Sequence, residues 1–161
     1  MYEYKCKILK VVDGDTVDVD IDLGFGCWLR GERVRVMGID TPESRTSDKV
    51  EKVFGLKAKE RLNSLLGTDA ILQTQVSKNG ENMKGKFGRI LGDFEFEHKQ
   101  ENNAYTIKRL TQLMIEEGHA VAYFGGSKEE ITMKHMANRE KLLREGVVDQ
   151  NQYDILMGEP D

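Results

Sequence analysis

The sequence predicts an α+β fold in which five short strands form a small barrel and three helices close it. Most of the first half of the chain alternates apolar and polar residues over short runs that end at turn residues, which is typical of strands. Farther along, apolar residues recur at helical spacing between capping residues. The oligonucleotide/oligosaccharide-binding (OB) barrel has this number of strands.

Three strands are expected before the first helix, over residues 4–12, 16–22 and 32–39. The connections between them are short, so we expect an antiparallel meander. Residues 24–31 contain several glycines and are predicted to form a loop. Trp28, in that loop, would either pack at its rim or offer a stacking platform. The polar face of the second strand carries three aspartates, which we expect to be solvated: Asp18, Asp20 and Asp22.

The first helix is bracketed by Asp48, a suitable N-cap, and Gly67, a suitable C-terminal glycine. Strand character returns at residues 70–77 and 87–96. A second helix is predicted from about Thr106 to Glu117.

The third helix has a capping box and ends at a glycine. Ser127 is followed three residues later by Glu130, and Gly146 stops the pattern. We interpret residues 1–146 as one domain. The acidic segment 147–161 has no strong periodicity, and we expect a flexible tail there.

Composition limits the classes of protein to consider. The chain has 161 residues, of which 39% are hydrophobic and 32% charged, as in one globular domain. It contains neither a signal peptide nor an apolar run long enough to span a membrane, so we expect a cytoplasmic protein without membrane contact. Its net charge of −4 excludes a strongly basic DNA-coating protein. We expect Cys6 and Cys27 to be reduced core thiols.

Two carboxylates stand at turns that flank predicted strands. Asp15 lies in the segment Asp13-Gly14-Asp15-Thr16, and Asp40 opens Asp40-Thr41-Pro42-Glu43. Taken singly, each segment reads equally as an ordinary turn. If the second and third strands are neighbours, the two carboxylates meet at one end of the barrel. Together with a backbone carbonyl they would form a water-rich cation site, which suits calcium best and magnesium as an alternative.

Two arginines and a glutamate extend this hypothesis. Arg35 lies on the third strand and Arg89 precedes a later one, and each alone would be a surface charge. Converging on a bound cation, they would hold a phosphate group through planar donors. Glu43 could orient or deprotonate a water molecule near that cation. The sequence shows no Ser-His or Cys-His pair and no phosphate-binding loop ending in Lys-Ser/Thr.

These segments, in this order, resemble the thermonuclease family typified by staphylococcal nuclease. The resemblance rests on Asp13–Val17, on Arg35 leading into Ile39–Glu43, and on Lys86-Phe87-Gly88-Arg89, and it covers roughly residues 4–146. It implies an OB-fold with three helices and a calcium-dependent nuclease, with Mg²⁺ or Mn²⁺ as alternatives. Such an enzyme cuts DNA and RNA with little sequence preference and leaves 3′-phosphate ends.

The resemblance also implies roles for individual residues. Asp15, Asp40 and the Thr41 carbonyl would bind calcium, and Glu43 would act on the attacking water. Arg35 and Arg89 would hold the phosphate and stabilise the charge that develops on it.

Substrate contacts are assigned to Lys86, Phe87 and Tyr123, and here the chain departs from the family. Phe87 stands where the family commonly has tyrosine, so a hydroxyl contact is lost, and Tyr123 matches a stacking tyrosine only loosely. Known members are basic whereas this chain is acidic. Substrate binding should therefore depend more on the cation and on Lys78, Lys84 and Lys86. Those lysines equally suit a solvated turn.

The leading hypothesis is therefore a metal-dependent nuclease whose partners are its DNA and RNA substrates, with no obligate protein partner. The alternative is a non-catalytic OB-fold module that binds nucleic acid or protein. The acidic surface and tail are what would favour a protein partner.

Overall fold

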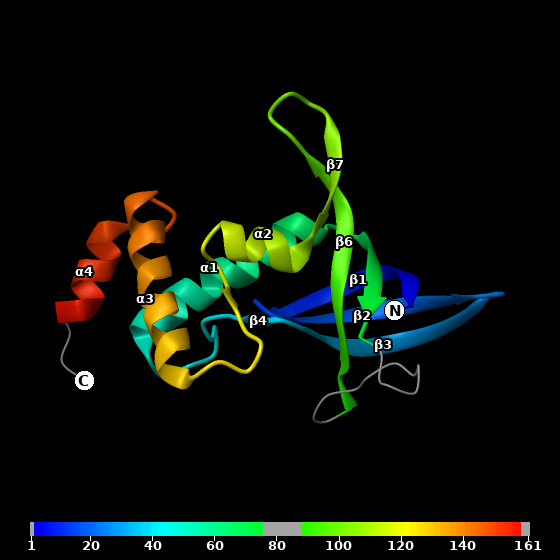
Figure 1. Cartoon of the computed structure of the whole chain (residues 1–161), viewed down its shortest axis with the longest axis horizontal. Helices are drawn as coiled ribbons and strands as arrows, with labels where there is room; N and C mark the ends of the chain where they lie inside the picture. The colour runs from blue at the N-terminus through cyan, green and yellow to red at the C-terminus, as the bar shows by residue number, and fades with distance from the viewer. Residues whose placement is uncertain (1, 76–87, 159–161) are drawn as a thin grey trace.

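Strands dominate the first two thirds of the chain and helices the last third (Figure 1). The computed structural model describes residues 2–75 and 88–158. Its strands are β1 (Glu3–Asp13), β2 (Thr16–Gly24), β3 (Cys27–Val36), β4 (Ile39–Asp40), β5 (Asp69–Thr74), β6 (Ile90–Lys99), β7 (Tyr105–Arg109) and β8 (Val121–Ala122). Its helices are α1 (Lys49–Leu66), α2 (Leu110–Glu116), α3 (Lys128–Arg144) and α4 (Gln150–Gly158). The fold is α+β, and the described ranges hold eight strands and four helices where five strands and three helices were predicted.

Six strands form the main sheet in the order β3-β2-β1-β5-β6-β7, with antiparallel neighbours throughout. In addition, β3 pairs in parallel with β6, Val34 lying opposite Ile90. The pairing thus runs from β3 through β2, β1, β5 and β6 back to β3. A separate antiparallel pair, β4–β8, places Asp40 opposite Val121. This pair brings the segment after β3 to the segment before α3.

The main core lies between the strands and α1. The strands contribute buried side chains such as Val17, Val34 and Phe94, and α1 adds Ala58 and Leu62. Local sequence explains why α1 forms. The Asp48 carboxylate accepts hydrogen bonds from the Val50 and Glu51 amides at 3.0 and 3.1 Å, which satisfies donors at the helix start. The predicted N-cap is therefore confirmed.

A second core cluster joins α1 to the two C-terminal helices. It consists of Phe54, Leu142 and Val148, and the Tyr153 ring of α4 meets Phe54 edge-on at 6.2 Å. Residues 147–158 were expected to belong to a flexible tail, and the structure instead shows them folded and packed. Apolar contacts with α1, which lies far away in sequence, account for this difference.

The second predicted helix, Thr106–Glu117, is wrong in its first half. Residues 105–109 form β7, which pairs with β6, and the helix begins only at Leu110. Ile107, which fits the helical spacing, is 71% exposed. The β6 partner decides the outcome here, because residues 105–109 pair with β6, the strand just before them, in an antiparallel hairpin.

The predicted loop 24–31 is also wrong, because it is a β-hairpin. Gly24 pairs with Cys27, so that Phe25 and Gly26 form the tip and β3 begins at Cys27. Two cations lie near the Trp28 ring, with Lys7 Nζ 5.5 Å and the Arg30 guanidinium carbon 4.8 Å from the ring centroid.

Two of the three β2 aspartates, Asp18 and Asp20, are ion-paired rather than free on a solvated negative face. Asp20 is only 8% exposed and accepts hydrogen bonds from Arg30 Nη1 at 2.9 Å and from the Gly31 amide at 2.8 Å. Asp18 forms a bidentate salt bridge with Arg33, whose Nε and Nη2 donate to the two carboxylate oxygens at 2.8 and 3.1 Å. Arginines on the neighbouring strand therefore neutralise both carboxylates.

The two cysteines are both free thiols, as predicted, but only one is in the core. Burial raises the pKa of Cys6 to about 12, whereas Cys27 is exposed on the hairpin. Among the described helices, none is both long and apolar enough to cross a membrane.

Candidate functional site

The turn between β1 and β2 packs directly against Thr41 and α1. A Cβ atom on Gly14 would lie 3.0 Å from Ala58 Cβ and 3.2 Å from Thr41 Oγ1, so glycine is what permits this contact. Thr41 is itself buried. The first carboxylate segment, 13–16, therefore lies beside the second, 40–43, as the sequence hypothesis requires.

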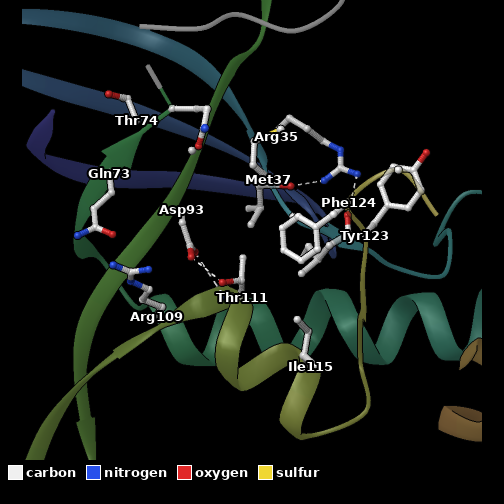
Figure 2. A pocket seen from close by; sticks show the side chains of 16 residues that line it. Arg35, Met37, Gln73, Thr74, Asp93, Arg109, Thr111, Ile115, Tyr123 and Phe124 are labelled. Carbon is white, nitrogen blue, oxygen red and sulfur yellow. Dashed lines mark hydrogen bonds between the residues drawn. The ribbon is translucent and has the colours of Figure 1, made fainter. Parts of the chain in front are cut away.

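Arg35 joins these two segments. Its Nη2 lies 3.3 Å from Asp15 Oδ2 and donates a hydrogen bond to the Ile39 carbonyl at 3.1 Å. Its Nη1 donates to the Val36 carbonyl (Figure 2). The β2–β3 register sets the position, because it places Arg35 opposite Thr16. The guanidinium is therefore fixed between Asp15 and the residue before Asp40.

Asp40 has a partner that the sequence did not predict. His135 Nε2, on α3, lies 2.7 Å from Asp40 Oδ2. His135 belongs to no recognisable sequence motif, and a lone histidine in a helix gives no signal of a pairing partner. The β4–β8 pair and α3 bring together two residues that lie 95 positions apart.

Glu43 precedes α1 and lies near charged side chains of α1 and α3. The Glu43 backbone carbonyl contacts α1 so closely that a Cβ on Gly55 would lie 2.2 Å from its oxygen. Burial raises the pKa of Glu51, and the negative charges of Glu43 and Asp48 raise it further, while Arg139 and His135 on α3 oppose the shift. Glu43 is thus within electrostatic range of Glu51.

Arg89 lines a cavity of about 570 Å³ together with Asp13 and Thr16, which stand on either side of Asp15 in the β1–β2 turn region. The Thr16 hydroxyl donates a hydrogen bond to Asp15 Oδ1 at 2.9 Å. Arg45 lines the same cavity. Sequence reasoning missed Arg45, although its position two residues after Glu43 could have drawn attention to it. Asp13 and Glu32 also line the cavity, so its charge is mixed, and the guanidinium groups of Arg45 and Arg89 are the part of it that suits an anion such as a phosphate group.

Tyr123 lies on the other side of Arg35. The two residues line a second cavity of about 560 Å³, together with Met37, Ile115 and Phe124 (Figure 2). The Tyr123 amide donates to the Gly38 carbonyl at 2.9 Å, which fixes the segment that carries the ring. The other predicted substrate residues, Lys86 and Phe87, lie outside the described residues, as do Lys78 and Lys84.

The Asp15 and Asp40 carboxylates are suitable ligands for a hydrated cation that prefers oxygen, but they do not form a complete coordination sphere by themselves. Within residues 2–75 and 88–158, no three His, Cys, Asp or Glu side chains are grouped so as to hold a metal ion. Asp15 and Asp40 supply hard carboxylate oxygens, and their side chains are 18% and 42% exposed. Calcium accepts irregular oxygen sites in which water molecules complete the coordination.

Two comparisons with known proteins bear on the family of this chain. The chain is 24% identical over 146 residues to "Protein ParB" of Escherichia coli, an alignment that covers 90% of this chain and 72% of that protein. The family described as staphylococcal nuclease homologue matches residues 33–147, which include Arg35, Asp40, Glu43 and Arg89. On that match, which spans more than half of its length, the chain belongs to the staphylococcal nuclease homologue family.

Proposed function

We propose that this protein is a metal-dependent nuclease that hydrolyses phosphodiester bonds of DNA and RNA with little sequence specificity and leaves 3′-phosphate ends. One observation carries the proposal: Arg35 lies 3.3 Å from Asp15 and bonds to the carbonyl that precedes Asp40. A guanidinium held beside two carboxylate segments suits the joint binding of a phosphate and a cation. The ring of strand pairs from β3 back to β3 supports an OB-type barrel as the scaffold.

Each residue at this end of the barrel would have a distinct task. Asp15, Asp40 and the Thr41 carbonyl would hold calcium, which supplies charge neutralisation and a more acidic bound water. Glu43 would orient the attacking water and accept its proton. Arg35 and Arg89 would bind the non-bridging phosphate oxygens and stabilise their growing charge, which is where preorganised donors contribute most.

The test uses supercoiled plasmid and end-labelled DNA and RNA oligonucleotides, each with Ca²⁺, Mg²⁺, Mn²⁺ or a chelator. We expect cation-dependent cutting of both nucleic acids and phosphatase-sensitive 3′ ends. Arg89→Ala should lower kcat by about 10²-fold or more, the usual cost of losing one such donor. Arg144→Ala, at the exposed end of α3, is the matched control. Intact substrate with all three cations would refute the proposal.

Asp40→Asn tests the cation assignment separately. Replacing a charged ligand by a neutral amide weakens the binding of a hard cation, so half-maximal activity should need more calcium. An unchanged calcium requirement would show that Asp40 is not a ligand.

A non-catalytic module that binds nucleic acid is the second candidate, and a specific observation favours it. The Asp15 carboxylate already has a charged partner, the Arg35 guanidinium at 3.3 Å. If this pair persists in place of a bound cation, the protein would bind a nucleic acid without cutting it. In a mobility-shift assay with cations present, retarded but full-length oligonucleotides would identify this function.

A further inference from the structure

Helix α3 places an imidazole on a carboxylate of the proposed cation site. His135 Nε2 lies 2.7 Å from Asp40 Oδ2, within the range of a strong hydrogen bond. The His135 side chain is 16% exposed, whereas that of Asp40 is 42% exposed. An ionised carboxylate only accepts hydrogen bonds, so the hydrogen in this contact is on Nε2.

Other contacts of the same helix fix the position of His135. Asn138, one turn farther along α3, donates from Nδ2 to the Ala120 carbonyl at 3.1 Å. Ala120 directly precedes β8, and Val121 in β8 pairs with Asp40. The helix therefore holds Asp40 twice, through its side chain and through the strand that pairs with its backbone.

Arg139 attaches the same stretch of α3 to α1. Its guanidinium lies 5.2 Å from the centre of the Phe54 ring, and Phe54 is buried in the second core cluster. Residues 135, 138 and 139 are spaced as neighbours on one side of a helix. The imidazole is therefore presented from a helix anchored at two further points rather than from an isolated surface side chain.

We propose that His135 is a positioning residue for the cation site, acting by holding one oxygen of Asp40 and leaving the other to the cation. This inference rests on the proposed function in one respect, because both use the same cation site. A half-exposed aspartate otherwise samples several rotamers, and ordering it for a ligand costs free energy. Hydrogen-bond partners behind metal ligands remove part of that cost, and their loss weakens metal binding by about 10–100-fold.

The test measures cation binding by the full-length protein without nucleic acid. Mn²⁺ binding is followed by the electron paramagnetic resonance signal of the free ion, and Ca²⁺ binding by calorimetry, both at one fixed pH. We expect His135→Ala to raise the Kd for both ions by about 10–100-fold. His135→Gln, whose amide nitrogen also donates, should stay within about threefold of the wild type, a margin far below the loss expected for alanine. His98→Ala, on β6, is the matched control and should leave both Kd values unchanged.

Three results would overturn the inference, and they are distinguishable. If His135→Ala binds as tightly as the wild type, His135 does not position Asp40, and the proposed nuclease function is unaffected. If alanine and glutamine weaken binding equally while urea unfolding shows both variants folded, the donor hydrogen is not what matters. If the wild type binds neither ion, the cation site is absent, and the metal dependence of the proposed function falls with it.

Discussion

At the scale of single residues, Gly55 sets the distance between α1 and the segment that carries Glu43. Ordinarily alanine is favoured over glycine inside a helix by about 1 kcal/mol. Here a Cβ would lie 2.2 Å from the Glu43 carbonyl oxygen and 2.6 Å from the Ser44 amide nitrogen, and both are backbone atoms that cannot rotate away. The clash therefore outweighs the helix preference.

We expect Gly55→Ala to lower the free energy of unfolding by about 1–3 kcal/mol, the usual cost of overpacking. Urea denaturation followed by circular dichroism measures this change. Gly158→Ala is the matched control, since a Cβ there would have no neighbour within 4 Å. A Gly55→Ala protein as stable as the wild type would show that α1 moves aside at little cost.

His119 gives a second prediction, for the pH dependence of stability. It is 5% exposed, its Nδ1 has no hydrogen-bond partner among the described residues, and burial lowers its pKa. In the unfolded chain the pKa is about 6.5. Below that pH the unfolded state binds a proton that the folded state does not, so stability falls until the folded pKa is reached.

His119→Gln should therefore reduce the loss of stability between pH 7.5 and pH 5.5, measured as the change in urea midpoint. His98→Gln serves as the control, and its urea midpoint should change between these two pH values as that of the wild type does. The prediction is contradicted if His119→Gln loses as much stability on acidification as the wild type does.

At the scale of elements, α2 begins where β6 supplies its cap. The helix has no side-chain cap of its own, and Asp93 of β6 takes that place. Asp93 Oδ2 accepts from Thr111 Oγ1 at 2.6 Å, and Oδ1 accepts from the Thr111 amide at 3.3 Å (Figure 2). Burial nevertheless raises the pKa of Asp93, so each donor to this carboxylate is important.

We expect Thr111→Val to lower the free energy of unfolding by about 1–3 kcal/mol, because it leaves the partly buried Asp93 carboxylate short of a hydrogen bond. Thr132→Val is the control, since its hydroxyl bonds to the Lys128 carbonyl on the exposed surface of α3. Equal unfolding free energies for the two variants would mean that Asp93 does not anchor α2.

At the scale of the whole molecule, a chain with a net charge of −4 must bind nucleic acid through local cations. Arg33, Arg45 and Arg89 line one cavity beside the proposed site, and Asp13 and Glu32 line it with them, so the local positive charge is small. Each phosphate neutralised on duplex DNA adds about −0.9 to the slope of log K against log[salt]. We therefore expect a shallow slope of about −1 to −3 for this protein.

Arg45→Ala should make this slope less steep by about 0.9 for duplex DNA, whatever the base sequence. Binding is measured by fluorescence anisotropy at several NaCl concentrations, with a chelator present to prevent cutting. Arg144→Ala, on the exposed end of α3, should leave the slope as in the wild type. An unchanged slope for Arg45→Ala would show that Arg45 does not contact the phosphates of the bound DNA.

The sequence by itself determined the features that depend on near neighbours. The caps at Asp48 and Ser127 were predicted correctly, and the Ser127 hydroxyl accepts from the Glu130 amide at 3.2 Å. These features are local, because a cap needs only a suitable side chain two or three residues from the amide it accepts from. The proximity of the Asp15 and Asp40 segments was expected from strand order, and their roles remain a prediction.

The structure decided the features that depend on which segments pair or dock. Residues 105–109 carry a helical pattern and yet form a strand, because they pair with the preceding strand, β6, in a hairpin. His135 has no motif around it, and only the docking of α3 gives it Asp40 as a partner. Local sequence sets preferences worth fractions of a kcal/mol per residue, and long-range pairing and burial outweigh them wherever the two conflict.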